Sequence, residues 1–343
     1  MKTINSNDCN YNYYLSLDWA QSNVAMGIMK NNAREPRAKP LPPDIKAVRD
    51  KIKSYSGSKI LVIEETTTSH WLYVNLIDVV DKIIICDPYR NSLLKDGPQN
   101  DKIDAKKLCL LLRNNMVKEV YHTLDKDYEI RKLVSAYEDL NKSIVRIKNQ
   151  RSAIFRGEGK NHKKEKELTD SEIKKFVTGK QLEILELLEE KKEQYENEFK
   201  KICHSHKIIQ NQRKISGIGY IRAVEIYSVV IDSGRFENKY KYWAYCGIVK
   251  QYKESGGRIY HAKQVRYSKI LKNCYKGAAN SAIGGNNDIR DYYEYLLSQG
   301  LTVEKAKNQI TRYIAKASYA MMKNKTEYIP YQWRDGIKKK KAI

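Results

Sequence analysis

Four carboxylates are the residues of this sequence whose types and spacing fit metal chemistry. Asp101 and Asp104 stand three residues apart at the start of a predicted helix, 101–113, and therefore share one face of it. Asp18 and Glu64 each end a predicted strand. Because functional groups of open α/β sheets gather beyond the strand ends, the four side chains can converge. Ligand sets made only of oxygen select Mg²⁺ or Mn²⁺, and two such ions support in-line attack on a phosphodiester.

Each carboxylate also has a purely structural reading. Acids are common at strand ends and helix starts, and Asp101 could simply cap its helix. Alternation along the strand does not choose between Glu64 and Glu65. The order of the four acids along the chain favours a catalytic role. Ribonuclease-H-like nucleases, including junction resolvases of the RuvC type, have the same order: an Asp on one strand, a Glu on a later strand, and Asp-x-x-Asp on a later helix.

The first third of the chain is predicted to form the α/β layer that positions these acids. Its strands are too apolar to face water, so helices must cover them. The predicted strands are two within 12–30, then 58–65, 82–87 and 117–122, and the predicted helices are 47–55, 69–81 and 101–113.

Residues 125–210 show a different pattern. Ile130, Tyr137 and Ile144 belong to one apolar series with steps of three and four, and Leu185 to Ile202 contains a second. This heptad pattern predicts two long helices forming an antiparallel coiled-coil hairpin, which would serve dimerisation or bridging. Two ordinary amphipathic helices packed on a domain are the alternative.

A mostly helical, basic domain is predicted over 211–330, followed by a short basic tail, 331–343. Gly217 and Gly219 lie in a tight turn before a helix, where free N–H groups can bind phosphate. A turn between packed helices explains the same residues equally well.

Ser255 lies in the segment "KESGGR", where Lys253 and Arg258 flank it. A serine between cations could attack a phosphodiester whose charge the cations stabilise. Ser-Gly-Gly is also ordinary turn composition, and the segment is not the G-x-S-x-G of hydrolases.

Charge points to a polyanionic partner. The 343 residues include 64 Lys and Arg against 41 Asp and Glu, a net charge of +23, which favours nucleic acid over a basic membrane-surface protein. No apolar run is long enough to span a bilayer, and the first residues do not resemble a signal peptide. The six scattered cysteines form no CxxC pair, and Cys203, His204 and His206 are too closely spaced for a zinc finger. We therefore expect a cytoplasmic, nucleoid-associated protein with reduced thiols.

Taken in order, these segments resemble one family, the DEDD-type insertion-sequence transposases of the IS one-ten family, to which the pilin-gene invertase is related. The segments that carry the resemblance are "YLSLDWAQSNVAMGIM", "VIEETTTSHWLYVNLI", "NDKIDAKKL", "ISGIGYIRAVEI", "RFENKYKYWAYCGI" and "QYKESGGRI". The sequence departs from the family pattern at Gln99 and Asn100, at Thr67 and at Ser216.

The resemblance implies an RNase-H-fold, RuvC-like domain over 11–124, whose acids Asp18, Glu64, Asp101 and Asp104 hold Mg²⁺. It implies that Ser255 is a nucleophile giving a transient 5′-phosphoserine link, and that the two domains form a composite site across subunits. The implied partners are donor and target DNA, a structured bridge RNA that guides the reaction, and further copies of the chain in a dimer or tetramer.

Two other functions remain open on the sequence. One is a metal-dependent nuclease or Holliday-junction resolvase in which Ser255 is structural. The other is a domesticated nucleic-acid-binding protein without activity, against which the presence of all four acids argues.

Overall fold

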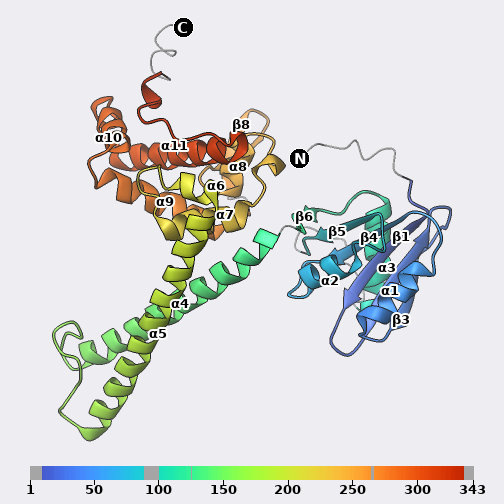
Figure 1. The fold of residues 1–343 in the computed structure, drawn as a ribbon, viewed down its shortest axis with the longest axis horizontal. Helices are drawn as coiled ribbons and strands as arrows, with labels where there is room; N and C mark the ends of the chain where they lie inside the picture. The colour runs from blue at the N-terminus through green and yellow to red at the C-terminus, as the bar shows by residue number, and fades with distance from the viewer. Residues whose placement is uncertain (1–9, 89–99, 125, 264–265, 336–343) are drawn as a thin grey trace. The chain divides into compact units, whose positions relative to one another are not determined.

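The computed structural model describes residues 10–88, 100–124, 126–263 and 266–335, in two compact units (Figure 1). Thr3–Asp125 form the first, here called the sheet unit, and Lys126–Ile343 belong to the second, the helical unit. This division falls where the sequence predicts the end of the α/β layer. No described helix is both long and apolar enough to cross a membrane.

The sheet unit is a mixed six-stranded sheet with three helices. Its elements are β1 (Tyr13–Trp19), β2 (Val24–Lys30), β3 (Arg37–Leu41), α1 (Ile45–Lys53), β4 (Lys59–Glu64), α2 (Ser69–Leu76), β5 (Lys82–Cys86), α3 (Asp101–Arg113) and β6 (Glu119–Val120). The strand order is β3-β2-β1-β4-β5-β6, with β1, β4 and β5 parallel and the other pairs antiparallel. The predicted α/β layer is confirmed. Strand β3 was not predicted, because "RAKPL" is short and contains two charged residues and a proline, which strands disfavour.

Both faces of the central strands are buried, as the apolar strands predict. Leu17 of β1 and Ile63 of β4 belong to one core, which includes α1 and α2 residues. Tyr14 and Val62 belong to a second core on the other face, together with Leu108 of α3. The side-chain alternation of a strand therefore decides whether a residue faces α3.

Gly27 lets α3 approach the sheet closely. A Cβ atom at this position would lie 2.3 Å from the Ser16 Oγ and 2.5 Å from the backbone oxygen of Ala105 on α3. Ser16 itself donates a hydrogen bond of 2.6 Å to that Ala105 oxygen. The start of α3, which carries two of the predicted acids, is thus held directly against β1 and β2.

We expect Gly27→Ala to lower the free energy of unfolding by about 1–3 kcal/mol, because overpacking forces backbone or side-chain shifts. Thermal unfolding of the full chain measures this. Gly157→Ala is the matched control, since a Cβ there meets nothing within 4 Å and alanine favours the helix. Equal melting temperatures for Gly27→Ala and the natural chain would refute the close approach.

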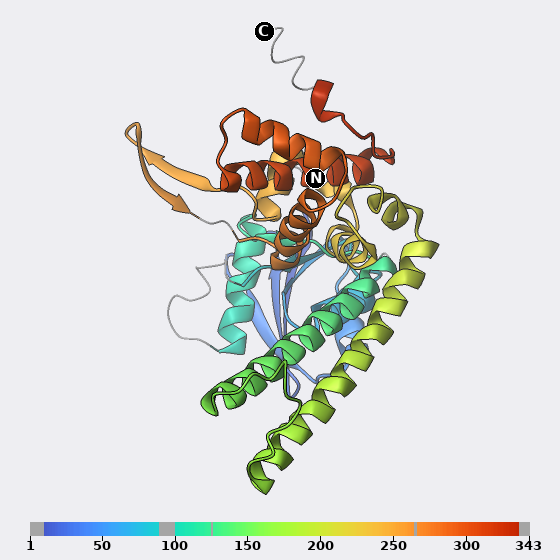
Figure 2. The ribbon, with the colours of Figure 1, turned by 90° about the vertical axis from the view of Figure 1, so that its left-hand side faces the viewer.

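The helical unit contains two long helices in the range where a coiled-coil hairpin is predicted, followed by the C-terminal helices. Its elements are α4 (Ile130–Gly157), α5 (Glu172–Ser205), α6 (Lys207–Gln212), α7 (Tyr220–Val230), α8 (Lys239–Tyr245), β7 (Gln251–Ser255), β8 (Arg258–Lys263), α9 (Lys269–Ile283), α10 (Asp288–Ser298) and α11 (Val303–Asn324), with short 3₁₀ turns at Lys126–Glu129 and Ser233–Arg235. Helices α4 and α5 lie side by side as two long antiparallel helices (Figures 1 and 2). Helices α6 and α10 were not predicted: α6 has only six residues, whereas α10 has Ile289, Tyr292 and Leu296 at helical spacing.

The base of the α4–α5 pair belongs to the same core as the C-terminal helices. Ile130 and Tyr137 of α4 and Phe199 of α5 are buried there with residues of α7, α9 and α11. Toward the other end of α5, the apolar residues Phe176 and Leu187 are 66% and 54% exposed. The hairpin is therefore anchored in the helical unit at one end only.

The segment after α11 folds back onto α10. The indole of Trp333 stacks on Tyr292 with 4.9 Å between ring centroids, and its Nε1 donates to the Asp288 backbone oxygen. The first residues of the predicted tail are therefore packed. The remainder, 336–343, and the predicted loop at 89–99 lie outside the described residues.

Candidate active site

Asp18 and Glu64 are neighbours at one edge of the sheet. Strands β1 and β4 are parallel and pair Leu17 with Ile63, so the next residue of each strand stands at the same level. Alternation places Asp18 with Ser16, and Glu64 with Val62, on the face that α3 covers. Glu65 lies beyond the strand and is exposed, with its N–H bonded to the Cys86 oxygen.

Helix α3 brings the other two acids to this edge. Asn100 is its N-cap, with Oδ1 accepting from the Ile103 N–H at 2.9 Å. Asp101 is therefore the first helical residue rather than the cap, and its carboxylate accepts from Asn23 Nδ2 at 3.2 Å. Asp104, one turn later, has Lys107 Nζ 3.9 Å from its Oδ1.

The electrostatics show that the four carboxylates lie near one another. Burial, and then the negative charges of Asp101 and Asp104, raise the pKa of the Asp18 carboxyl. Burial, and then Asp18 and Asp104, raise the pKa of Glu64. In both cases neighbouring carboxylates raise the pKa, so the ionised side chains repel one another. The structure thus brings together the four acids that the sequence suggests, and it selects Glu64 over Glu65.

The donor chemistry of this cluster suits a hard cation. The Oδ1 atom of Asp104 is buried and accepts no hydrogen bond from the described part of the chain. Carboxylate oxygens are the ligands that Mg²⁺ and Mn²⁺ prefer. As the side chains are placed, no three His, Cys, Asp or Glu residues among those described stand close enough to hold a metal ion.

Ser255 lies at the tip of a β-hairpin. Gly256 and Gly257 both have positive φ, +59° and +73°, as a two-residue type I′ turn requires. Ser255 and Arg258 flank the turn as a cross-strand pair and therefore share one face of the hairpin. Both residues are exposed. Figure 2 shows the hairpin extending away from the helices of its unit.

Exposed apolar side chains line the same hairpin. Tyr252, Ile259 and Tyr260 are 62%, 66% and 60% exposed. Lys253 is part of β7, but its side chain lies outside the described ones. The hairpin thus presents a serine, an arginine and aromatic rings to solvent, which suits contact with a nucleic-acid strand.

The two glycines of the predicted phosphate turn have different surroundings. Gly217 has φ of +88°, and a Cβ there would lie 2.1 Å from the Ala278 backbone oxygen of α9, so packing alone explains it. Gly219 is the N-cap of α7 and has open space where a Cβ would be. Of the two, only Gly219 leaves room for a ligand at the helix start.

Sequence reasoning missed Glu225, a buried carboxyl of α7. It is 7% exposed and accepts from the Cys274 Sγ at 2.9 Å. Burial first, and also the neighbouring Glu138, raise its pKa to about 7, although the Cys274 hydrogen bond and Arg222 oppose the rise. A single carboxylate within the apolar run "AVEIYSVV" was the signal available in the sequence.

Glu225→Gln should stabilise the chain at about pH 8 but not at about pH 4.5. The folded pKa of Glu225 exceeds the unfolded one, so the folded state binds more protons between about 4.5 and 7, and stability falls as pH rises through that window. At about pH 8 the substitution should raise the free energy of unfolding by on the order of 1–3 kcal/mol. Thermal melts across this range measure it, with the exposed Glu193→Gln as control. A gain independent of pH contradicts the raised pKa.

One comparison with known proteins matches part of the helical unit. Residues 210–294 match the family model described as "Transposase IS116/IS110/IS902 family". The matched range holds the glycine turn, the serine hairpin and helix α9. The match supports a transposase. More particularly, it supports a transposase of the IS110 family. A search among curated proteins found no match.

Proposed function

We propose that this protein is an RNA-guided DNA transposase that cuts and rejoins strands through a serine–phosphodiester intermediate. The observation that carries the proposal is the family match over 210–294, because this range contains Ser255 on its exposed hairpin. The four-acid cluster and the net charge of +23 support it from outside that range.

In this proposal the sheet unit is a RuvC-like metal domain. Asp18, Glu64, Asp101 and Asp104 would hold Mg²⁺ or Mn²⁺, and the bound ion would stabilise the charge that develops on phosphate oxygens. The repulsion among these carboxylates favours the proposal, since clustered negative charge disfavours the fold and a bound cation would relieve it.

Ser255 is the proposed nucleophile. Its Oγ attacks the phosphorus, an Oγ–P bond forms, the bond from phosphorus to the 3′ oxygen breaks, and the hydroxyl proton passes to that leaving oxygen. The strand is then held through a 5′-phosphoserine link, which a 3′ hydroxyl of another strand can reverse. Arg258, across the hairpin turn, is placed to stabilise the phosphate charge.

The proposed partners are donor and target DNA, a structured guide RNA and further copies of this chain. The exposed apolar residues of α5, such as Phe176 and Leu187, support pairing through the coiled coil. Gly219, with open space at the start of α7, and Arg258 support contacts with phosphate.

Sequencing the nucleic acid that co-purifies with the full chain tests the RNA guidance. We expect one discrete structured RNA, encoded beside the gene. Random fragments alone would contradict RNA guidance and favour the second candidate, a metal-dependent nuclease or junction resolvase. That candidate is supported by the four acids lying together within a single unit.

A further inference from the structure

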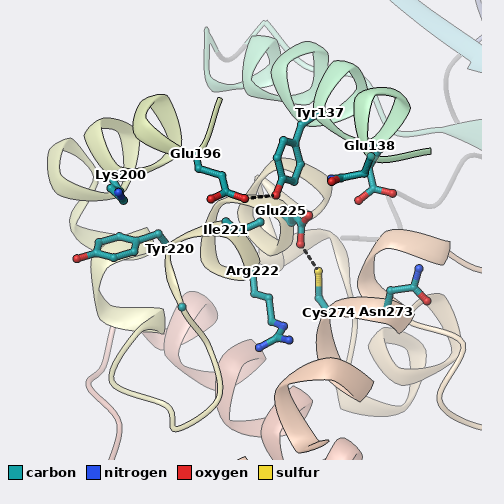
Figure 3. Close-up of a pocket in the computed structure, with 12 residues that line it drawn as sticks. Tyr137, Glu138, Glu196, Lys200, Tyr220, Ile221, Arg222, Glu225, Asn273 and Cys274 are labelled. Carbon is teal, nitrogen blue, oxygen red and sulfur yellow. Dashed lines mark hydrogen bonds between the residues drawn. The ribbon is translucent and has the colours of Figure 1, made fainter. Parts of the chain in front are cut away.

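A cavity of about 550 Å³ lies where α4 and α5 meet α7 and α9 within the helical unit (Figure 3). Its volume is in the range of small-molecule sites. The lining comes from four helices and contains aromatic, amide, carboxyl and cationic side chains. The lining includes Tyr137, Glu138 and Asn141 of α4, Glu196 and Lys200 of α5, Tyr220, Arg222 and Glu225 of α7, and Asn273 and Cys274 of α9. Gly219, the N-cap of α7, also lines it.

The wall of the cavity is acidic, although the chain is strongly basic. Glu225 accepts from the Cys274 thiol rather than from a cation. The nearby Arg222 instead donates to the Gly217 backbone oxygen at 2.7 Å and to the Ser281 Oγ at 3.1 Å. Burying a carboxyl without a hydrogen-bonded cation is unfavourable, so such a group in a cleft is a candidate for a functional site. Such a wall attracts N–H donors and repels phosphate.

The other lining groups indicate a planar ligand. Tyr137 donates to Glu196 at 2.8 Å, which holds its ring beside Glu225, as Figure 3 shows. The amides of Asn141 and Asn273 can donate and accept hydrogen bonds at a ring edge. Aromatic rings with polar groups at the edge are how proteins read unpaired bases.

Guanine is the base whose edge fits a carboxylate best. It presents two adjacent donors, N1–H and the N2 amino group, to the two carboxylate oxygens. Adenine and cytosine place a ring acceptor beside their amino group, and uracil and thymine flank their single N–H with carbonyls, so a carboxylate repels these edges.

Phosphate has a separate place at the mouth. Lys200 lies on the same side as Tyr220 in Figure 3. Gly219 is the N-cap of α7, directly before Tyr220, and has open space where a Cβ would be. Helix starts and lysines bind phosphate. A nucleotide would thus have its base toward Glu225 and its phosphate toward Lys200.

We propose that this cavity receives one unpaired guanine of a nucleic-acid strand, with the Glu225 carboxylate accepting from its N1–H and N2 amino groups. The inference rests on the proposed function, since it requires that a strand reaches the helical unit. The strand can be DNA or RNA, because both carry the same guanine edge.

Binding should depend on pH, because only ionised Glu225 accepts from both donors. Burial and Glu138 raise its pKa to about 7, so the preference for guanine rises between about pH 6 and pH 8. The titratable and charged groups around Glu225 are Tyr137 and Glu138 of α4, Glu196 and Lys200 of α5, Arg222 of α7 and Cys274 of α9.

The test measures binding of short fluorescent homopolymers to the full chain. One set is oligothymidine with a single central guanine, inosine, adenine or cytosine, and the other is oligouridine with the same substitutions. We expect guanine to bind about tenfold tighter than the plain homopolymer, as one good bidentate contact provides. Inosine, which lacks the N2 amino group, should lose most of that gain. Comparison of the two sets shows whether DNA or RNA is preferred.

Glu225→Gln and Asn273→Ala should remove the guanine preference and its pH dependence while leaving homopolymer binding unchanged. Asn273 is exposed, so its variant has little effect on folding. Glu193→Gln, an exposed carboxyl outside the cavity, is the control and should keep the preference. Equal affinity for all bases, or a preference that survives Glu225→Gln, overturns the inference but not the proposed function. No binding of any strand overturns both.

Discussion

Ser255→Ala should abolish the covalent protein–DNA adduct and reduce recombination by about a thousandfold or more, because loss of a nucleophile removes the chemical step. The fold should be unaffected, since Ser255 is exposed at a hairpin tip and Gly256 and Gly257 form the turn. The measurement is a denaturing gel of labelled DNA incubated with the protein, guide RNA and Mg²⁺.

Ser56→Ala serves as its control, because this serine is also exposed and belongs to the sheet unit rather than to the hairpin. It should form the adduct normally. An adduct formed by Ser255→Ala would end the serine hypothesis. DNA cleavage by the same variant, with no adduct in the natural chain, would identify a nuclease.

Asp18→Asn should lower metal-dependent activity by more than about a hundredfold while raising thermal stability. Burial and the charges of Asp101 and Asp104 raise the folded pKa of Asp18 above its unfolded value. Its ionised form therefore destabilises the fold, and stability falls as pH rises through the folded pKa. Because solvent screens this half-buried group, we expect a rise in Tm of only a few degrees at neutral pH without metal.

Mg²⁺ provides a readout independent of activity. The natural chain should melt at a higher temperature when Mg²⁺ is added, since a ligand of the folded state stabilises it. Asp18→Asn and Asp104→Asn should lose most of that shift. Asp78→Asn is the contrasting control, because Asp78 pairs with Arg49 at 2.6 Å and its pKa is lowered. The Asp78→Asn variant should have a lower melting temperature than the natural chain, and Mg²⁺ should still raise that temperature. An unchanged shift in Asp104→Asn would exclude the acids as the metal ligands.

Much of the fold follows from local sequence patterns. The predicted helix 101–113 is confirmed as α3 with the same bounds, because Asn100 caps its start and the apolar spacing continues to Arg113. Strand β3 and helices α6 and α10 were missed. Strand β3 and helix α6 are too short to show a clear period, whereas Ile289, Tyr292 and Leu296 gave α10 a helical pattern that was available in the sequence.

Part of the candidate site could also be predicted from local sequence patterns. Asp18 and Glu64 follow apolar runs that end where the strands end, and this placed them at the sheet edge in advance. The sequence could not show the repulsion among the four acids, because it depends on how closely α3 approaches the sheet. That approach is set by Gly27 against Ser16 and Ala105, and Ala105 is distant from Gly27 in the chain.

The sequence by itself determined the α/β layer, the two long helices, the four acids and the serine between cations. Only the tertiary structure decided between Glu64 and Glu65, because that choice depends on the face that α3 covers. It alone showed that Gly217 is required by Ala278 and that Glu225 lines a cavity built from four helices. The periodicity of apolar residues indicates which face of a helix or strand is buried. The residues against which that face packs are set by contacts between segments that are distant in the chain.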